Sequence, residues 1–522
     1  MTASREERRR ALREVPRAAA LVASLVLALL SPCAARADEA LLPAPDDIGD
    51  PGLSEEEVAW IEEPELDPTD SGATAPGLEP DGAELAGLLD GYLDEAFPAC
   101  GMPGAAVAVV DADGVRYLRC LGDVTGADQT FLVGSLSKSM TAVAVMQLVD
   151  AGLVSLDDPA GAYAPELGVP GSVTVRDLLN QTSGFGYYES LAEASVGESA
   201  GTFSYANANY DLLGRIVEDV SGQSFDAYLR EHVFGPLGMD DASAGSGSGG
   251  APQAPGHRSW FGAYVADGFE HEGGDDAWGG PSSGYVRASI DDMASYLRMY
   301  LYSGEGALSP DALHQMVFSR VPDPSGDTYY GMGWTTFAWD DGELVMSHDG
   351  QVENYVARMC IIPGRSLGVV VLADGNDEFG GNEAFFSLAD GVTSIAVGGA
   401  ADVPDGSALL AEHALYNVVY LVCVCAAAAP LACALRGRRS LGAAWEVALH
   451  VVLPASLLFL PRMELGMRLR DFCDFYPDQA LVLLACCGLL LAGGVVRAAF
   501  IALKRPVSAS RAARMRSFER DE

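Results

Sequence analysis

The sequence predicts an α+β fold, in which an antiparallel sheet flanked by helices is joined to a helical region and followed by a C-terminal helical membrane region. Apolar, strand-like runs occur near both ends of the central part of the chain, and helical periodicity lies between them. A long apolar stretch begins after residue 412. Strands from both ends of one region, with helices between them, are typical of a single α+β domain.

The central domain is expected to span residues 85–400. Residues 85–97 have helical spacing, and the apolar runs 105–111 and 115–121 meet at Asp113-Gly114, which favours a hairpin. The same spacing predicts four further helices, at residues 135–151, 210–220, 225–233 and 290–302. Two closing strands are expected at residues 355–362 and 367–373.

Charge divides the chain into three parts. The net charge is −41, yet residues 38–412 hold 12 Lys and Arg against 62 Asp and Glu. The first 37 residues hold 7 basic and 3 acidic groups, and residues 413–522 hold 13 basic and 8 acidic groups. This acidic middle part argues against nucleic acid and anionic membrane surfaces as its partners.

The N-terminus is typical of a secretory signal peptide over residues 1–37. Six arginines precede the apolar run 18–30, and Ala35-Arg36-Ala37 is a small-x-small cleavage site. An uncleaved anchor is the alternative. Residues 38–84 are acidic and rich in Pro and Gly, which predicts a disordered linker, with a wrapped N-terminal arm as the alternative.

The C-terminal part predicts a transmembrane region over residues 413–503, with spans near 414–435, 443–460 and 480–496. Basic residues follow the first span and fill the tail 504–522. The positive-inside rule then places the tail in the cytoplasm and the acidic domain outside, as a multi-pass protein of the cell membrane. A buried apolar helical subdomain is the alternative.

Cysteine usage gives no metal site. Six of the ten cysteines lie in the C-terminal apolar region, and Cys33 belongs to the signal. Cys100, Cys120 and Cys360 remain, which allows one disulfide whose partners the sequence leaves open. No spacing resembles a zinc site, so we expect no metal.

The strongest chemical motif is Ser135-Leu136-Ser137-Lys138. Residues three apart share a helix face, so the Ser135 hydroxyl and the Lys138 amine should be within reach of each other. A serine nucleophile needs a base, and a lysine serves only when burial lowers its pKa. The chain has only two lysines, Lys138 and Lys504, and otherwise uses Arg, which cannot lose its proton.

Two further motifs follow in order, Tyr205-Ala206-Asn207 and His348-Asp349-Gly350. With Ser135-x-x-Lys138, this set resembles the three-motif signature of the β-lactamase-related serine hydrolases. That family includes class C β-lactamases, penicillin-binding DD-carboxypeptidases, D-amino-acid peptidases and esterases. The resemblance covers residues 85–374 and implies a serine β-lactamase/DD-peptidase-like fold.

The resemblance also implies a role for each matching residue. Ser135 would be acylated, Lys138 and Tyr205 would shuttle its proton, and Asn207 would orient substrate and lysine. His348 and Gly350 would contact substrate, and the backbone N–H groups of Ser135 and Gln351 would form the oxyanion hole. Penicillin-directed members have Lys at the position of His348, and Asp349 would repel a carboxylate if it faced the site. Both departures favour esters or amides over β-lactams.

We therefore expect an extracytoplasmic, membrane-anchored serine hydrolase that needs no cofactor. It would act on a small-molecule or peptide substrate outside the cell and bind no nucleic acid. A DD-peptidase or β-lactamase is the alternative activity. An acylatable sensor with little turnover and a cell-envelope scaffold with an inactive site are the rival classes.

Overall fold

The computed structural model describes residue 80 and residues 82–245, 250–302, 304, 306–324, 326–339, 342–438 and 442–504. The predicted signal peptide, nearly all of the predicted linker and all but the first residue of the basic tail lie outside these ranges. The chain divides into two compact units. Of the described residues, those up to His413 form one unit and those from Ala414 onward form the other.

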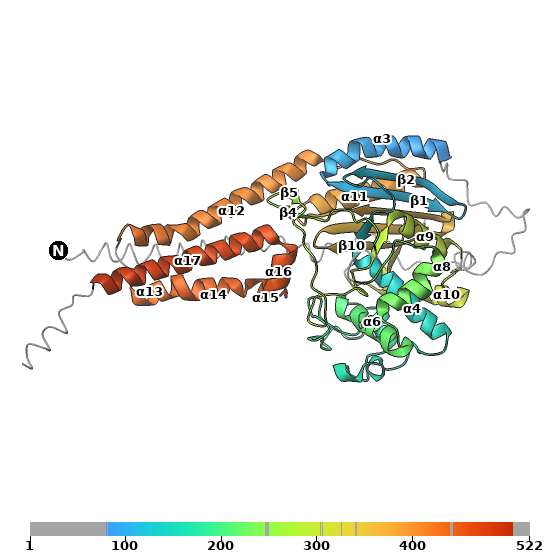
Figure 1. The fold of residues 1–522 in the computed structure, drawn as a ribbon, viewed down its shortest axis with the longest axis horizontal. Helices are drawn as coiled ribbons and strands as arrows, with labels where there is room; N and C mark the ends of the chain where they lie inside the picture. Colours follow the sequence, from blue (N-terminus) through green and yellow to red (C-terminus); the bar gives the residue numbers. More distant parts are fainter. Residues whose placement is uncertain are drawn as a thin grey trace, which may run out of the picture. The chain divides into compact units, whose positions relative to one another are not determined.

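The first unit is built on an eight-stranded antiparallel sheet in the order β2-β1-β12-β11-β10-β9-β8-β7 (Figure 1). Its strands are β1 (Gly104–Asp111), β2 (Gly114–Gly122), β7 (Val321–Pro322), β8 (Tyr329–Gly331), β9 (Trp334–Ala338), β10 (Leu344–Val352), β11 (Tyr355–Ile362) and β12 (Leu367–Ala373). β1 pairs with β12, with Val107 opposite Val371. Strands from the two ends of the domain thus lie side by side, which confirms the predicted α+β sheet.

Helices cover both faces of this sheet. α3 (Gly82–Cys100) and α11 (Gly381–Ala396) pack together, and α11 contacts β11 and β12. α9 (Ile290–Leu301) contacts β1 and β12. Every residue of β11 and β12 is buried. Such strands are covered on both faces, which explains why the closing pair appears in the sequence as unbroken apolar runs.

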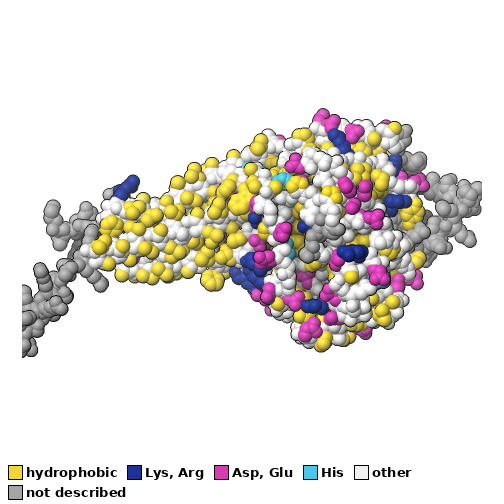
Figure 2. All heavy atoms as spheres, in the orientation of Figure 1, with side chains coloured by type: hydrophobic (Ala, Val, Ile, Leu, Met, Phe, Trp, Pro, Cys, Tyr) yellow, Lys and Arg dark blue, Asp and Glu magenta, His cyan; other side chains and the backbone are white. Residues whose placement is uncertain are grey.

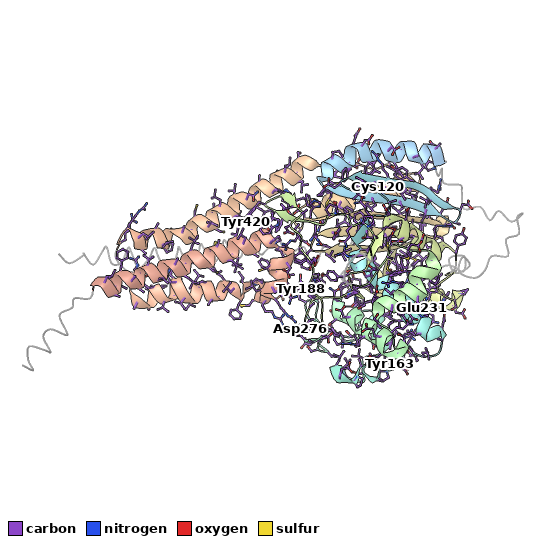
Figure 3. All side chains as sticks on the ribbon, viewed as in Figure 1. Cys120, Tyr163, Tyr188, Glu231, Asp276 and Tyr420 are labelled. Atoms are coloured by element: carbon purple, nitrogen blue, oxygen red, sulfur yellow. The ribbon has the colours of Figure 1, made fainter. Side chains whose placement is uncertain are left out.

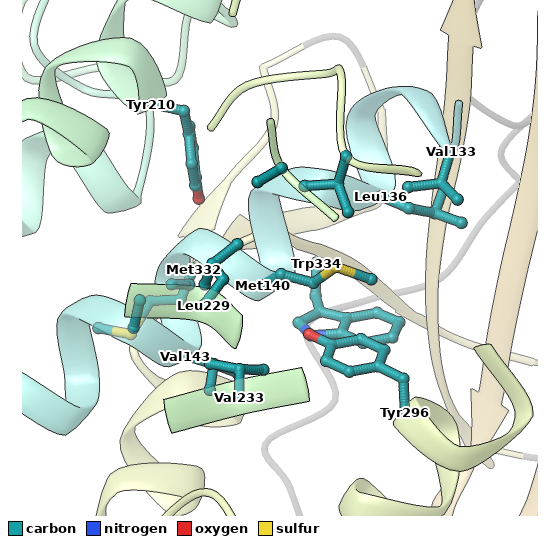
Figure 4. Close-up of a cluster of buried hydrophobic side chains, with 14 of the residues drawn as sticks. Val133, Leu136, Met140, Val143, Tyr210, Leu229, Val233, Tyr296, Met332 and Trp334 are labelled. Atoms are coloured by element: carbon teal, nitrogen blue, oxygen red, sulfur yellow. The ribbon is translucent and has the colours of Figure 1, made fainter. Parts of the chain in front are cut away.

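A helical region extends beyond α9 and surrounds α4 (Ser137–Asp150). Its other helices are η2 (Ala160–Ala162), η3 (Pro165–Leu167), α5 (Val175–Leu179), α6 (Asn207–Ser221), α7 (Phe225–Leu229), η4 (Arg230–Phe234), α8 (Gly235–Leu237) and α10 (Pro310–Phe318). Two smaller sheets complete the unit: one of β13 (Gly375–Asn376), β4 (His257–Trp260) and β5 (Ala263–Val265), and one of β3 (Thr130–Leu132) and β6 (Arg287–Ser289). Figure 4 shows Met140 and Val143 of α4 packed among side chains from this region. α4 is therefore a core helix, buried from Ser137 to Met146.

Local structure differs from the predictions at three places. The helix expected at residues 135–151 begins as a 3₁₀ turn, η1 (Gly134–Leu136), before α4. The helix expected at 225–233 is α7 followed by the π-helical segment η4. The His348 motif, expected just before the last strand pair, lies inside β10. All the cysteines that the structure describes, including Cys100, Cys120 and Cys360, are free thiols.

Within the described residues, two helices are long and apolar enough to cross a membrane: α12 (Gly406–Leu435), whose first turns belong to the first unit, and α17 (Pro477–Lys504) of the C-terminal unit. The third predicted span, at 443–460, is a shorter apolar helix made of α13 (Ala443–Val447), η6 (Ala448–Val452) and α14 (Leu453–Leu458). α15 (Leu460–Glu464) and α16 (Leu469–Phe475) follow it. Figure 2 shows hydrophobic side chains over the surface of these helices, and Leu421 is 64% exposed. Such exposure is unusual in water and suits an apolar environment.

Candidate active site

Two glycines bring the turn that carries Ser135 against β10. Gly134 has φ +59°, a backbone conformation that glycine adopts without strain. A Cβ on Gly134 would lie 2.2 Å from the backbone N of Gln351, and one on Gly350 would lie 2.0 Å from the carbonyl O of Val133. No side chain fits at either position. The glycines of the first and third motifs are therefore required for their close approach.

Lys138 is fully buried and contacts three polar atoms. Its Nζ lies 3.0 Å from the Ser135 Oγ, 2.7 Å from the Asn207 Oδ1 and 2.6 Å from the carbonyl O of Ser283. Burial lowers the pKa of Lys138 to about 7, although the negative charge of Asp211 opposes the shift. Much of the amine is therefore neutral near pH 7.

These contacts fix the direction of the amine lone pair. Asn207 Oδ1 and the Ser283 carbonyl can only accept hydrogen bonds, so each takes one N–H from Lys138. A neutral amine has two N–H groups, and its lone pair then faces the Ser135 hydroxyl. The site is arranged for Lys138 to take the proton of Ser135.

Tyr205 completes the contacts around the nucleophile. Its hydroxyl donates to the Ser135 Oγ at 2.8 Å, and its ring centroid lies 4.7 Å from the Lys138 Nζ. Burial raises the pKa of Tyr205 well above its usual value, so this hydroxyl stays protonated. Tyr205 can therefore hand a proton to a leaving group and regain one from Lys138.

α6 supplies one predicted site residue and one that the sequence reasoning missed. Asn207 is its first residue, and Asp211 follows one turn later on the same face. Burial raises the pKa of Asp211 to about 6, while hydrogen bonds from Ser283 and the Gly280 backbone oppose the shift. The four-residue spacing from Asn207 could have identified Asp211. Nothing in the sequence marks Ser283, which accepts the Lys138 hydrogen bond through its backbone carbonyl.

His348 and Asp349 project from opposite faces of β10, because successive side chains of a strand alternate. The His348 Nε2 lies 3.3 Å from the Tyr330 hydroxyl, and its ring centroid is 6.4 Å from that of Tyr205. The His348 Nδ1 lies 2.7 Å from the carbonyl O of Asp349. Burial and the charge of Lys138 lower the pKa of His348 to about 4. The imidazole is therefore neutral at pH 7.

Asp349 does not face the site, so the condition for repulsion of a carboxylate is not met. Its carboxylate faces the other side of the sheet, where the Arg358 guanidinium binds both carboxylate oxygens, at 2.6 and 2.8 Å. Arg358 also pairs with Asp390 of α11. The third motif thus presents neither an anion nor a cation to the reaction site, only the neutral His348.

The structure brings Ser135, Lys138, Tyr205 and Asn207 into one hydrogen-bonded cluster. Gly350 and the Gln351 backbone lie against the nucleophile turn. The pairing of the Ser135 and Gln351 N–H groups as an oxyanion hole stays a prediction. In the ranges that the structure describes, no three His, Cys, Asp or Glu side chains gather as a metal site.

Comparison with known proteins gives consistent results. Residues 85–391 match the family described as Beta-lactamase. Penicillin-binding protein 4 of Amycolatopsis lactamdurans is 30% identical over 325 residues, which cover 52% of this chain and 81% of that protein. Protein flp of Staphylococcus aureus strain MW2 is 24% identical over 318 residues, covering 53% of this chain and 61% of flp, so the chain spans less than two thirds of that relative.

A solved structure shares the fold. The octameric penicillin-binding protein homologue from Pyrococcus abyssi superimposes with a TM-score of 0.51 at 24% identity. The alignment covers 60% of this chain and 78% of that one. At this identity the likeness concerns the fold alone.

Proposed function

Because the chain belongs to the Beta-lactamase family, we propose that it is a serine hydrolase that cleaves ester or amide substrates through an acyl-enzyme on Ser135. The observation that carries the proposal is the buried Lys138, which touches the Ser135 Oγ and is largely neutral near pH 7. A free serine hydroxyl is a poor nucleophile because it keeps its proton, and a neutral amine can accept that proton.

The contacts suggest an order of proton transfers. The Ser135 Oγ attacks the substrate carbonyl while its proton passes to Lys138. The negative charge on the carbonyl oxygen is met by the Ser135 and Gln351 N–H groups. Tyr205 then protonates the departing oxygen or nitrogen and is reprotonated by Lys138, leaving an ester on Ser135. Water repeats the sequence with the same residues, releasing the acid and restoring the serine.

The absence of a cation at the position of His348 favours ester or amide substrates over β-lactams. A penicillin-type substrate carries a carboxylate, and the family resemblance implies that a cation at this motif helps to bind it. Here the position holds a neutral His348. Asp349 is not the obstacle, since it is paired with Arg358 on the other side of the sheet.

We also propose that the hydrolase domain lies outside the cytoplasmic membrane and is anchored by its C-terminal helices. The support is the predicted signal peptide, the exposed apolar surfaces of α12 and α17, and the basic residues that follow the predicted spans. A membrane-impermeant fluorophosphonate added to intact cells should then label the protein; labelling only after lysis would contradict this orientation.

A fluorophosphonate probe tests the catalytic proposal directly. The full-length protein in detergent should be labelled, and Ser135→Ala should remove the label. Ser387→Ala, on the exposed side of α11, is the matched control and should be labelled as the wild type is. Persistent labelling of Ser135→Ala would assign the nucleophile elsewhere, and a wild type that never reacts would favour an inactive scaffold.

A further inference from the structure

An aromatic cluster lies beside the ring of Tyr205. Tyr187 and Tyr188 come from the segment between α5 and α6, and Trp278 comes from the segment between β5 and β6. The ring centroid of Tyr187 is 5.9 Å from that of Tyr205 and 5.8 Å from that of Trp278. Tyr188 and Trp278 are 5.1 Å apart. We call Tyr187, Tyr188 and Trp278 the aromatic wall.

A hydrogen bond holds the aromatic wall in place beside the site. The Trp278 Nε1 donates to the carbonyl O of Tyr187 at 2.7 Å, which ties the two segments together. Next to Trp278, a Cβ on Gly279 would lie 3.1 Å from the Asn207 Nδ2, so the wall also adjoins Asn207. Tyr187 is nevertheless 37% exposed. Aromatic surface held open to solvent beside a reaction centre is available to a substrate.

The two segments that carry the aromatic wall are acidic. Residues 186–195 and 270–280 contain no Lys or Arg and six acidic residues: Glu189, Glu193, Glu270, Glu272, Asp275 and Asp276. Figure 3 labels Tyr188 and Asp276 on the same side of the domain. Arg215 lies at the edge of this region, where it pairs with Asp275 at 3.4 Å. The field of these carboxylates attracts cations and repels anions.

We propose that the aromatic wall is a subsite for a cationic group, so that the preferred ester or amide substrates carry an ammonium group. Aromatic faces attract cations, and quaternary ammonium groups are bound by such clusters. The surrounding carboxylates add a long-range attraction that a neutral apolar group would not feel. This inference rests on the proposed hydrolase function and names the class of substrate for the same site.

Paired esters of equal shape test the subsite. The first pair consists of p-nitrophenyl esters whose acyl chains end in a trimethylammonium group or in its tert-butyl isostere. The second pair consists of the butyrate esters of choline and of the alcohol in which tert-butyl replaces trimethylammonium. In at least one pair, kcat/KM for the cationic ester should exceed that for its isostere by about tenfold, equivalent to ~1.4 kcal/mol. The ratio should fall as salt is added.

Variants distinguish the contribution of the aromatic rings from that of the surrounding carboxylates. Trp278→Leu and Tyr187→Leu should each lower the ratio of cationic to neutral kcat/KM several-fold, since both keep an apolar side chain but remove a ring face. Asp276→Asn should lower the ratio and weaken its salt dependence. Asp113→Asn, the same charge change at the exposed β1–β2 turn, should leave the ratio as in the wild type. Equal rates within both pairs, or unchanged ratios in the ring variants, would overturn the proposal.

A binding measurement distinguishes failure of the subsite from failure of the hydrolase function. Calorimetry with Ser135→Ala reports binding of each ester without turnover. Tighter binding of the cationic member supports the subsite even if the wild type hydrolyses neither ester, in which case the hydrolase proposal alone would fail. Equal binding of the two members would overturn the subsite even if both are hydrolysed.

Discussion

The pH dependence of serine acylation should follow the ionisation of Lys138. Its pKa of about 7 means that roughly a tenth of the amine is neutral at pH 6 and about nine tenths at pH 8. Because only the neutral amine accepts the Ser135 proton, the second-order rate of fluorophosphonate labelling should rise about tenfold between these two values. The rate should then level off above pH 8.

Asp211→Asn should move the midpoint of this labelling profile to lower pH. The Asp211 carboxylate favours the charged form of Lys138 and so raises its pKa. Without that charge, the pKa of Lys138 should fall and the midpoint of the labelling profile should move to lower pH. The variant should therefore be labelled faster than the wild type at pH 6, relative to its own plateau.

The assay is the labelling rate from pH 5 to pH 9 for the wild type, Asp211→Asn and Asp219→Asn. Asp219 is exposed on the same helix and serves as the charge-matched control, for which the midpoint should not change. A flat wild-type profile would show that Lys138 is not the titrating base. A midpoint that rises or stays fixed in Asp211→Asn would refute the assigned electrostatics.

Four further outcomes follow from the same contacts. Lys138→Arg, which keeps the charge but cannot become neutral, should slow labelling by about 10²–10⁴-fold in a kinetic assay. Gly134→Ala, which forces a positive φ and a clash with Gln351, should cost more than about 2 kcal/mol in a denaturant titration and remove labelling. Arg358→Met, which leaves Asp349 without its partner, should destabilise the protein by about 3 kcal/mol, and an added Asp349→Asn should restore part of that loss on thermal melting. A chromogenic cephalosporin should be hydrolysed slowly by the purified protein, and rapid turnover would contradict the account of His348.

The sequence predicted the site better than its surroundings. The spacing of Ser135 and Lys138 and the scarcity of lysine pointed to this pair, and the structure places the Lys138 Nζ 3.0 Å from the Ser135 Oγ. The groups that set the pKa of Lys138 are harder to predict from the sequence, for different reasons. Asp211 was visible only through its helical spacing from Asn207, and the Ser283 carbonyl is a backbone group that any residue could supply.

The sequence analysis left open whether Asp349 faces the site. Strand alternation alone shows that His348 and Asp349 cannot both face the site. Which of them faces it depends on the register of β10 with β11, where Asp349 lies opposite Arg358. That pairing joins positions nine residues apart on neighbouring strands, and opposite charges across a hairpin are a usable signal in a sequence.

The fold class was predictable because buried strands at both ends of the domain have a clear apolar signature. The boundaries of the middle helices were less so, since the 3₁₀ turn at Ser135 and the π-helical segment η4 arise from packing against β10 and the α4 core. The third span, at 443–460, stays a prediction: the apolar helix there ends at Leu458, and α15 begins at Leu460.

The most direct test of the central claim is rapid-quench mass spectrometry of the protein during hydrolysis of an activated ester. The account predicts a transient adduct with the mass of the acyl group, mapped to Ser135, that forms and decays at rates matching turnover and is absent from Ser135→Ala. Hydrolysis without an adduct, or an adduct on another residue, would contradict it. An adduct on Ser135 that never decays would replace the hydrolase with the acylatable sensor.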